Sequence, residues 1–314
     1  MRQALSVAIC VIVSLVLAAI ATRYIHPHWT LATLYSLQLH AAAACIVALV
    51  VALAVKRHYL VWFLFAASLL FTGHAVLMGR EFAAPVTAEE AQAPTFRLLS
   101  FNILNDNYEN AESVVRAIAG SGADLVNIME AAPLRVHLDE LAKTYPYRVG
   151  CGVIIPFCDQ LMLSKTPIET PIVRSLSEIF PSRFILAKVA VAGRSINLVG
   201  IHTTKPYFDN FHSLELIRAA LAISEADGPL LVSGDFNASS LAPNMRRFLS
   251  LTELKTAEWE PATWPVRAGA FGVPIDHVYA RAPLKIKSLT RLADTHGSNH
   301  YGLMAEIAIT GAAP

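Results

Sequence analysis

The chain has 314 residues, of which 54% are apolar and only 16% are charged, and its formal net charge is +1. From residue 95 onward 20 Lys and Arg face 21 Asp and Glu, so this part lacks the basic excess typical of proteins that bind duplex nucleic acid through many phosphates. The apolar excess comes from roughly the first 80 residues, which are typical of membrane-spanning sequence and exclude an entirely soluble chain.

Three apolar runs, at residues 4–21, 31–55 and 59–78, each approach the length of about 20 residues that a helix needs to cross the hydrocarbon core. A signal peptide is the alternative for the first run, but two further runs follow it directly. We therefore expect a membrane anchor of three transmembrane helices over residues 1–80. A linker at 81–95 and one large α/β domain over 96–312 should follow.

The distribution of Lys and Arg in the short loops predicts the orientation of these helices. Arg2 precedes the first run and residues 56–58 (Lys-Arg-His) separate the second from the third, whereas Arg23 and Arg80 lie on the opposite side. Because cytoplasmic loops carry the positive excess, the amino terminus should lie in the cytoplasm. Three crossings then predict a multi-pass protein of the cell inner (plasma) membrane, with the large domain on the extracytoplasmic side.

Two histidines and two cysteines leave alternatives open. His40 and His74 lie within spans, where an ionisable group is a functional suspect, but we favour neutral imidazoles hydrogen-bonded to a neighbouring helix. Cys151 and Cys158 flank a six-residue loop that could bring them together. Outside the cytoplasm such a pair predicts a disulfide, and two buried thiols are the alternative.

Short apolar runs alternate with helical periodicities after the linker, which predicts an α/β domain. Strands are expected at 96–101, 125–129, 161–163, 184–191, 195–201, 228–232, 275–279, 284–289 and 301–309. Helices are expected at 110–121, 134–143, 211–225 and 243–251, and we interpret 211–225 as a covering helix only.

Polar side chains gather at the ends of these apolar strands. Such residues are Asn102, Glu130, His202, Asp235, Asn237, Asp276, His277, Asn299 and His300. Each alone has a harmless explanation, such as a turn residue or a helix cap, but their number favours a single site at one edge of the sheets. Asp235 and Asn237, two apart on an extended chain, should point the same way.

Six short motifs resemble, in chain order, the endonuclease/exonuclease/phosphatase superfamily. They are Phe-Asn at 101–102, Ile-Met-Glu at 128–130, Gly-Ile-His at 200–202, Gly-Asp-Phe-Asn at 234–237, Ile-Asp-His at 275–277 and Ser-Asn-His at 298–300. The resemblance covers roughly residues 95–310 and extends to bacterial integral-membrane members with amino-terminal helices. It implies a DNase I-like fold, a four-layer α/β sandwich, here preceded by about three transmembrane helices.

The resemblance also implies a metal site. Asn102 and Glu130 would hold a divalent cation, Mg²⁺ or Mn²⁺, because these ions prefer hard oxygen ligands. The family usually has Ser-Asp-His where this chain has Ser298–Asn299–His300, and that Asp tends to lie near the metal. Asn299 would keep an oxygen ligand without the negative charge, so the metal should bind more weakly or at a shifted place.

The catalytic roles follow from the same resemblance. Asp235 would orient or deprotonate the attacking water, and Asn237 would hold that water or a phosphate oxygen. His300, steadied by Asp276, would contact the phosphoryl oxygens, and His202 would stabilise the charge that builds on them. Phosphodiester hydrolysis needs these elements in any fold: an activated water, a cation and donors to the phosphoryl oxygens.

We therefore expect a membrane-anchored, divalent-metal-dependent phosphoesterase that hydrolyses a phosphodiester by metal-assisted water attack. The superfamily includes nucleases, inositol polyphosphate phosphatases and sphingomyelinases, so nucleic acid and phospholipid or another small phosphodiester remain open as substrates. The alternative, motivated by Asn299, is a non-catalytic or weakly active binding or scaffold protein that keeps the fold. A transporter ranks last, because three helices without convergent charges make a poor pathway.

Overall fold

The structure, a computed structural model, describes residues 2–311, which form two compact units. One unit contains the chain up to Glu81 together with Pro206–Asn210 and Ala238–Arg246. The other contains Phe82–Lys205, Phe211–Asn237 and the chain from Arg247 on. The domain limits predicted at residues 1 and 312 lie outside the described range.

The first unit is built on three long apolar helices, α1 (Arg2–Ala21), α3 (Gln38–Val55) and α4 (Tyr59–Glu81). All three are long and apolar enough to cross a membrane, as predicted. Their mutual core consists of Cys10, Val13, Leu17, Cys45, Leu49, Ala52, Val61 and Leu64. Large apolar side chains such as Leu15 and Phe63 are nevertheless two-thirds exposed (66% and 67%), which suits helices whose outer surfaces face lipid.

Hydropathy predicted a single helix for the second apolar run, but the structure divides this run into shorter elements. A 3₁₀ turn, η2 (Trp29–Leu31), and the short helix α2 (Ala32–Ser36) precede α3, and the chain leaves helical geometry at Leu37 (ψ 11°). The flanking Ser36 and Gln38 are buried polar residues whose hydrogen bonds are described below. Another short turn, η1 (Thr22–Tyr24), follows α1, and the Tyr24 hydroxyl is hydrogen-bonded to His74 Nδ1 at 2.9 Å, so His74 has a hydrogen-bond partner in a neighbouring element.

The second unit contains two mixed sheets. The six-stranded sheet has the order β10-β11-β1-β2-β4-β3, with β1 (Thr95–Asn102), β2 (Leu125–Met129), β3 (Tyr147–Val149), β4 (Gln160–Ser164), β10 (Leu284–Arg291) and β11 (Leu303–Ile309). The five-stranded sheet has the order β5-β6-β7-β8-β9, with β5 (Ile168–Arg174), β6 (Phe184–Val191), β7 (Arg194–His202), β8 (Leu230–Asp235) and β9 (Asp276–Arg281).

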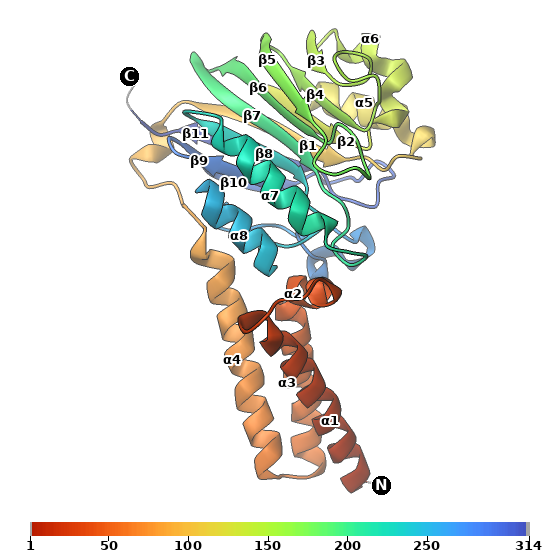
Figure 1. The fold of residues 1–314 in the computed structure, drawn as a ribbon, viewed down its shortest axis with the longest axis vertical. Helices are drawn as coiled ribbons and strands as arrows, with labels where there is room; N and C mark the ends of the chain where they lie inside the picture. The colour runs from red at the N-terminus through yellow and green to blue at the C-terminus, as the bar shows by residue number, and fades with distance from the viewer. Residues whose placement is uncertain (1, 312–314) are drawn as a thin grey trace. The chain divides into compact units, whose positions relative to one another are not determined.

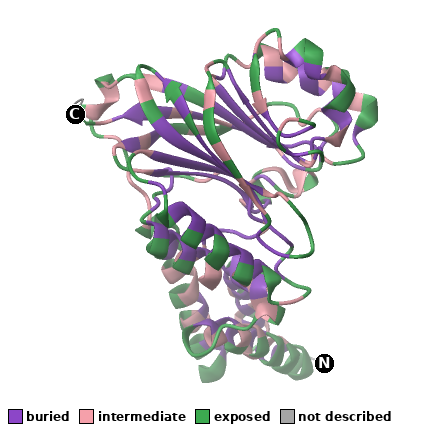
Figure 2. Ribbon diagram, turned by 45° about the horizontal axis from the view of Figure 1, so that its top comes forward, coloured by how far each residue is buried: buried purple, intermediate pink, exposed green. Residues whose placement is uncertain are grey.

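The two sheets pack face to face with helices on their outer sides, which confirms the predicted α/β sandwich (Figure 1). The helices and 3₁₀ turns are η3 (Glu90–Gln92), η4 (Tyr108–Asn110), α5 (Ala111–Gly120), η5 (Ala132–His137), α6 (Leu138–Leu141), α7 (Phe211–Ser224), α8 (Pro243–Thr252) and η6 (Val266–Phe271). Leu98, Leu231 and Leu303 belong to the core between the sheets. Most strand residues are buried, as Figure 2 shows in purple.

Two strands and one helix differ from the prediction. β3 and β5 carry no strong apolar signal, because β3 has only three residues and β5 has no fully buried residue and an irregular register between Glu169 and Ile172. The helix predicted at 134–143 is instead divided between the 3₁₀ helix η5, which begins at Ala132, and the four-residue α6. Neither difference affects the strands that carry the predicted site residues.

The strand register places several predicted site residues opposite one another on adjacent strands. β7 and β8 are parallel with His202 opposite Asp235, and the antiparallel β9 places Asp276 opposite Asp235 on its other side. In the other sheet β1 and β2 are parallel, and Asn102 pairs with Met129, the residue before Glu130. Because neighbouring residues in register share a face, these side chains converge at the strand ends.

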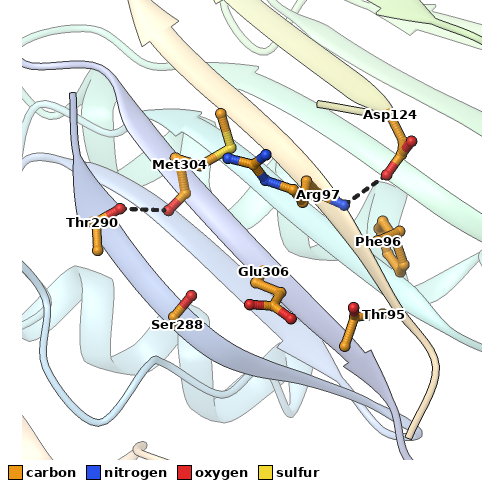
Figure 3. Close-up of a pocket in the computed structure, with 8 residues that line it drawn as sticks. All are labelled: Thr95, Phe96, Arg97, Asp124, Ser288, Thr290, Met304 and Glu306. Carbon is orange, nitrogen blue, oxygen red and sulfur yellow. Dashed lines mark hydrogen bonds between the residues drawn. The ribbon is translucent and has the colours of Figure 1, made fainter. Parts of the chain in front are cut away.

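A surface depression of about 450 Å³ lies elsewhere, on strands β1, β10 and β11 (Figure 3). Its lining is Thr95, Phe96, Arg97, Asp124, Ser288, Thr290, Met304 and Glu306. None of the predicted site residues lines it, so this depression is separate from the strand ends that carry them.

The close contact of β7 and β8 depends on a glycine. Gly234 has φ +150°, and a Cβ there would lie 1.7 Å from the Ile201 carbonyl oxygen. Since this neighbour is backbone within the sheet, Gly234→Ala should lower the free energy of unfolding by more than about 3 kcal/mol. Denaturant unfolding of the full chain in detergent measures this.

The matched control is Gly120→Ala at the end of α5, where a Cβ would meet nothing within 4 Å. That change should alter stability by less than about 1 kcal/mol. Equal stability of both variants would contradict the steric role assigned to Gly234.

Candidate active site

Asp235 is the centre of the candidate site. It is 1% exposed, and both its oxygens accept hydrogen bonds: Oδ2 from Asn102 Nδ2 at 2.9 Å and Oδ1 from the Asn237 backbone N–H at 2.8 Å. Asn237 adopts φ 51°, which turns the backbone back toward the carboxylate, and its Nδ2 donates to the Thr203 carbonyl. Burial raises the pKa of Asp235, and the Asp276 carboxylate raises it further.

An imidazole held by a second aspartate lies on one side of Asp235. His300 Nδ1 is 2.8 Å from Asp276 Oδ2, and its Nε2 is 3.9 Å from Asp235 Oδ2. Burial alone would lower the pKa of His300, but the carboxylates of Asp276 and Asp235 outweigh it and raise the pKa to about 9. The imidazole is therefore a cation at neutral pH, with Nε2 directed at Asp235.

A matching pair on the other side includes a residue that the sequence did not indicate, Asp159. His202 Nδ1 is 3.3 Å from Asp159 Oδ2, and its Nε2 is 3.9 Å from Asp235 Oδ2. Asp159 also receives two hydrogen bonds from Arg183, at 2.6 and 3.1 Å. Burial works against its ionisation, but His202 and Arg183 lower the pKa of Asp159 to about 2. Arg183 thus binds the same carboxylate that holds His202.

Asp159 directly follows Cys158, and Cys151 and Cys158 form a disulfide with their Cα atoms 4.2 Å apart. The predicted disulfide is therefore confirmed. It closes the loop that leads into β4, next to the residue that holds His202.

Glu130 and Asn102 supply oxygen and amide groups next to Asp235. Glu130 has φ 59° and a side chain 24% exposed, and its Oε2 accepts the Asn105 backbone N–H at 2.7 Å. Asn102 Nδ2 lies between the two carboxylates, 3.2 Å from Glu130 Oε1 and 2.9 Å from Asp235 Oδ2. Turning the Asn102 amide over would present its Oδ1 there instead. This set of hard oxygens, rich in negative charge, fits a divalent cation.

A second group that could hold a metal consists of Asp235, Asp276 and His300, whose ligand atoms lie within 4.8 Å of one another. The protonated His300 ring already offsets part of the negative charge of this group, because its Nδ1 is hydrogen-bonded to Asp276 Oδ2. The remaining Asp276 oxygen, Oδ1, is buried and has no hydrogen-bond partner among residues 2–311, so it is available to a ligand.

Asn299 lies apart from these contacts. It is exposed, whereas its neighbours Ser298 and His300 are buried. Ser298 Oγ donates to the Asn102 carbonyl at 2.7 Å and accepts the His300 N–H at 3.0 Å, which fixes the loop on the predicted metal side. The position of Asn299 is thus set by the residues that flank it.

Helix α7, interpreted from its sequence as a cover, in fact holds two strand ends. His212 Nε2 donates to the Phe236 carbonyl at 2.7 Å, between Asp235 and Asn237. Glu215 Oε2 accepts the Thr204 N–H at 2.6 Å, two residues after His202. Both side chains are about 1% exposed. The sequence shows polar residues on the apolar face of this helix, but it does not show which backbone groups His212 and Glu215 bind.

Comparison with known proteins identifies the family. The profile of the Endonuclease/Exonuclease/phosphatase family matches residues 99–300, a stretch that contains every residue described above as part of the site. The chain belongs to this family. Among curated proteins no sequence matches the chain.

Several solved structures share the fold. An endonuclease/exonuclease/phosphatase from Bacteroides vulgatus is 17% identical, with TM-score 0.56, over 69% of this chain and 99% of its own. D. rerio TDP2 complexed with a single-strand DNA product is 16% identical, with TM-score 0.55, over 68% and 98%. A Staphylococcus aureus beta toxin mutant with bound magnesium ions is 14% identical, with TM-score 0.50, over 68% and 99%.

Membership of the endonuclease/exonuclease/phosphatase family makes the chain a metal-dependent hydrolase of phosphoric ester bonds. The buried carboxylate flanked by two imidazoles agrees with that chemistry, because phosphoryl transfer needs a base for water and donors to the phosphoryl oxygens.

The burial of His212 predicts a pH dependence of stability. Burial lowers its pKa to about 4 despite the hydrogen bond to Phe236, against 6.5 for an exposed histidine. Stability from the neutral imidazole is therefore present above pH 6.5 and is lost as the pH falls through 4. The loss should total about 3 kcal/mol, measured as the free energy of unfolding between pH 7 and pH 4.

His212→Gln is the control, because it keeps a donor for the Phe236 carbonyl and cannot titrate. The variant should lose clearly less stability over this pH range than the wild type. Parallel pH profiles for both proteins would contradict the buried, neutral state of His212.

Proposed function

We propose that this protein is a membrane-anchored phosphodiesterase whose catalytic domain works outside the cytoplasm. The observation that carries the proposal is the arrangement around Asp235, whose Oδ2 lies 3.9 Å from the Nε2 atoms of both His202 and His300. One buried carboxylate between two imidazoles can accept a proton from water while the imidazoles bind the phosphoryl oxygens.

Asp235 is the proposed general base. The Asn237 backbone N–H holds its carboxylate, and its raised pKa makes it a better proton acceptor than an exposed aspartate. Asn237 donates its backbone N–H to Asp235, so its carboxamide is positioned next to the base, where it would hold the water or a phosphate oxygen.

The two imidazoles have related roles. Asp276 holds His300 through Nδ1 and keeps it protonated, which leaves Nε2–H to donate to a phosphoryl oxygen. Asp159 holds His202 through Nδ1 in the same way, so its Nε2 faces the same space. Negative charge that develops on the phosphoryl group thus meets the fixed Nε2–H donor of His300, with the His202 ring beside it.

Glu130 and Asn102 are the proposed ligands of Mg²⁺ or Mn²⁺, and Asn299 is a third candidate on the adjoining loop. A divalent ion bound there would polarise the phosphoryl oxygen and lower the pKa of a bound water. The all-oxygen donor set at Glu130 suits these ions better than the group that contains His300. The magnesium ions bound to the Staphylococcus aureus beta toxin support this choice.

Two features support a phospholipid or another small phosphodiester over long duplex DNA. The chain from residue 95 on has no basic excess. Trp259 and Trp264, on the segment between α8 and β9, are 74% and 41% exposed, which suits loops that contact lipid. Short single-stranded nucleic acid is the competing substrate, supported by the DNA product bound to TDP2.

Removal of the base should lower turnover strongly. Asp235→Asn keeps the shape of the side chain but cannot accept the proton, so kcat should fall about 10²- to 10⁴-fold. Hydrolysis of bis-p-nitrophenyl phosphate by the full chain in detergent with Mg²⁺ measures this.

Asp227→Asn, an exposed aspartate just before the same strand, should keep wild-type activity. EDTA should inactivate the wild type, and Mg²⁺ or Mn²⁺ should restore it. Equal inertness of wild type and Asp235→Asn with every divalent metal would favour a scaffold protein.

The orientation predicts the compartment of the domain. A disulfide at Cys151–Cys158 agrees with an oxidising, extracytoplasmic location. A reporter that functions only outside the cytoplasm, fused after Pro314, should therefore be active. A silent reporter of this kind beside an active cytoplasmic one would contradict the orientation.

A further inference from the structure

The unit that contains the membrane helices also contains two segments of the catalytic half of the sequence. These are Pro206–Asn210, four residues after His202, and Ala238–Arg246, which begins directly after Asn237. The chain that leaves the Gly-Asp-Phe-Asn motif therefore passes at once into the helical unit. The contacts inside this unit show how firmly the second segment is held.

Ser36, the last residue of α2, makes a two-way contact with Ser239. The Ser239 N–H donates to Ser36 Oγ at 3.2 Å, and Ser239 Oγ donates to the Ser36 carbonyl at 3.1 Å. Both serines are buried, at 8% and 1% exposure. Buried hydrogen bonds of this kind are costly to lose, because water does not replace either partner.

Arg23, in the turn η1 after α1, binds the same segment. Its Nη2 donates to the Leu241 carbonyl at 2.6 Å, and its Nη1 donates to Gln38 Oε1. Gln38 is fully buried and donates through Nε2 to the Phe71 carbonyl of α4 at 3.2 Å. One guanidinium thus links the end of α1, the start of α3 and, through Gln38, the backbone of α4 to residue 241.

Arg246 closes the other end of the segment. Its Nη1 donates to the Met78 carbonyl near the end of α4 at 3.0 Å, and its Nη2 pairs with Glu81. A buried arginine such as Arg23, at the end of a membrane span, is expensive unless its donors are used. The turn after α1, the short helix α2 and the end of α4 all bind this segment, and Gln38 of α3 supports Arg23. This is more contact than a tether alone requires.

We propose that the membrane helices are part of the catalytic machinery, because they hold Ala238–Arg246 and thereby position Asn237 and Asp235. This inference rests on the proposed function. Asn237 is one peptide bond from Ala238, its backbone N–H binds Asp235, and its left-handed conformation leaves little freedom. A shift of Ser239 or Leu241 is therefore transmitted to the base, and Arg23 acts as a positioning residue.

The test uses the full chain in nanodiscs and two variants, Arg23→Gln and Ser36→Ala. Each should raise hydrogen exchange of the amides at 238–242 at least tenfold. Each should also lower kcat about 10- to 100-fold with KM within about threefold, because a displaced base affects turnover more than binding. Arg23→Lys, which keeps a donor, should recover part of both effects.

Arg2→Gln is the matched control, the same substitution at the other end of α1, and it should leave exchange and kcat unchanged. Protected amides in β2 show that a variant is folded. Wild-type exchange at 238–242 together with wild-type kcat in both folded variants would overturn the inference. An inactive wild type would instead refute the proposed function, and the exchange measurement would still test the role of Arg23.

Discussion

The structure depends on the burial of one carboxylate, that of Asp235. An ion removed from water must find partners in the protein, or it is neutralised. Asp235 has two hydrogen-bond donors, from Asn102 and Asn237, and two imidazoles at 3.9 Å. Each of these partners lies at or next to a strand end, or on the loop before β11. The strand ends of the two sheets must therefore lie side by side to provide the Asp235 carboxylate with its partners.

The layers beneath and beside the site keep that register. Asn127 in β2 donates to the Ser233 carbonyl in β8 at 3.0 Å. This hydrogen bond joins the two sheets two residues before Asp235. Gly200 makes room for this contact, since a Cβ there would lie 2.6 Å from Asn127 Oδ1. Helix α7 holds the β8 end through His212. The inner side of the site is thus held by hydrogen bonds within the protein, which is the arrangement that preorganised catalysis requires.

The sequence predicted the sandwich and most strands, because buried strands and their polar ends leave local patterns. It did not indicate Asp159, since that residue meets His202 across 43 positions of chain and only through the pairing of strands. The break at Leu37 was missed because hydropathy does not reveal the buried hydrogen bonds of Ser36 and Gln38. Partnerships between distant polar groups are set by tertiary structure, which short-range patterns do not contain.

The most direct test of a metal-dependent site around Asp235 is a crystal structure of the full chain soaked with Mn²⁺, with the ion located by its anomalous scattering. We predict an ion bound by Glu130 and by Asn102 with its amide turned to present Oδ1, while His300 stays bonded to Asp276. The same data show whether Asn299 is a ligand. An ion bound instead by Asp276 and His300, or no ion at the strand ends, would contradict the account.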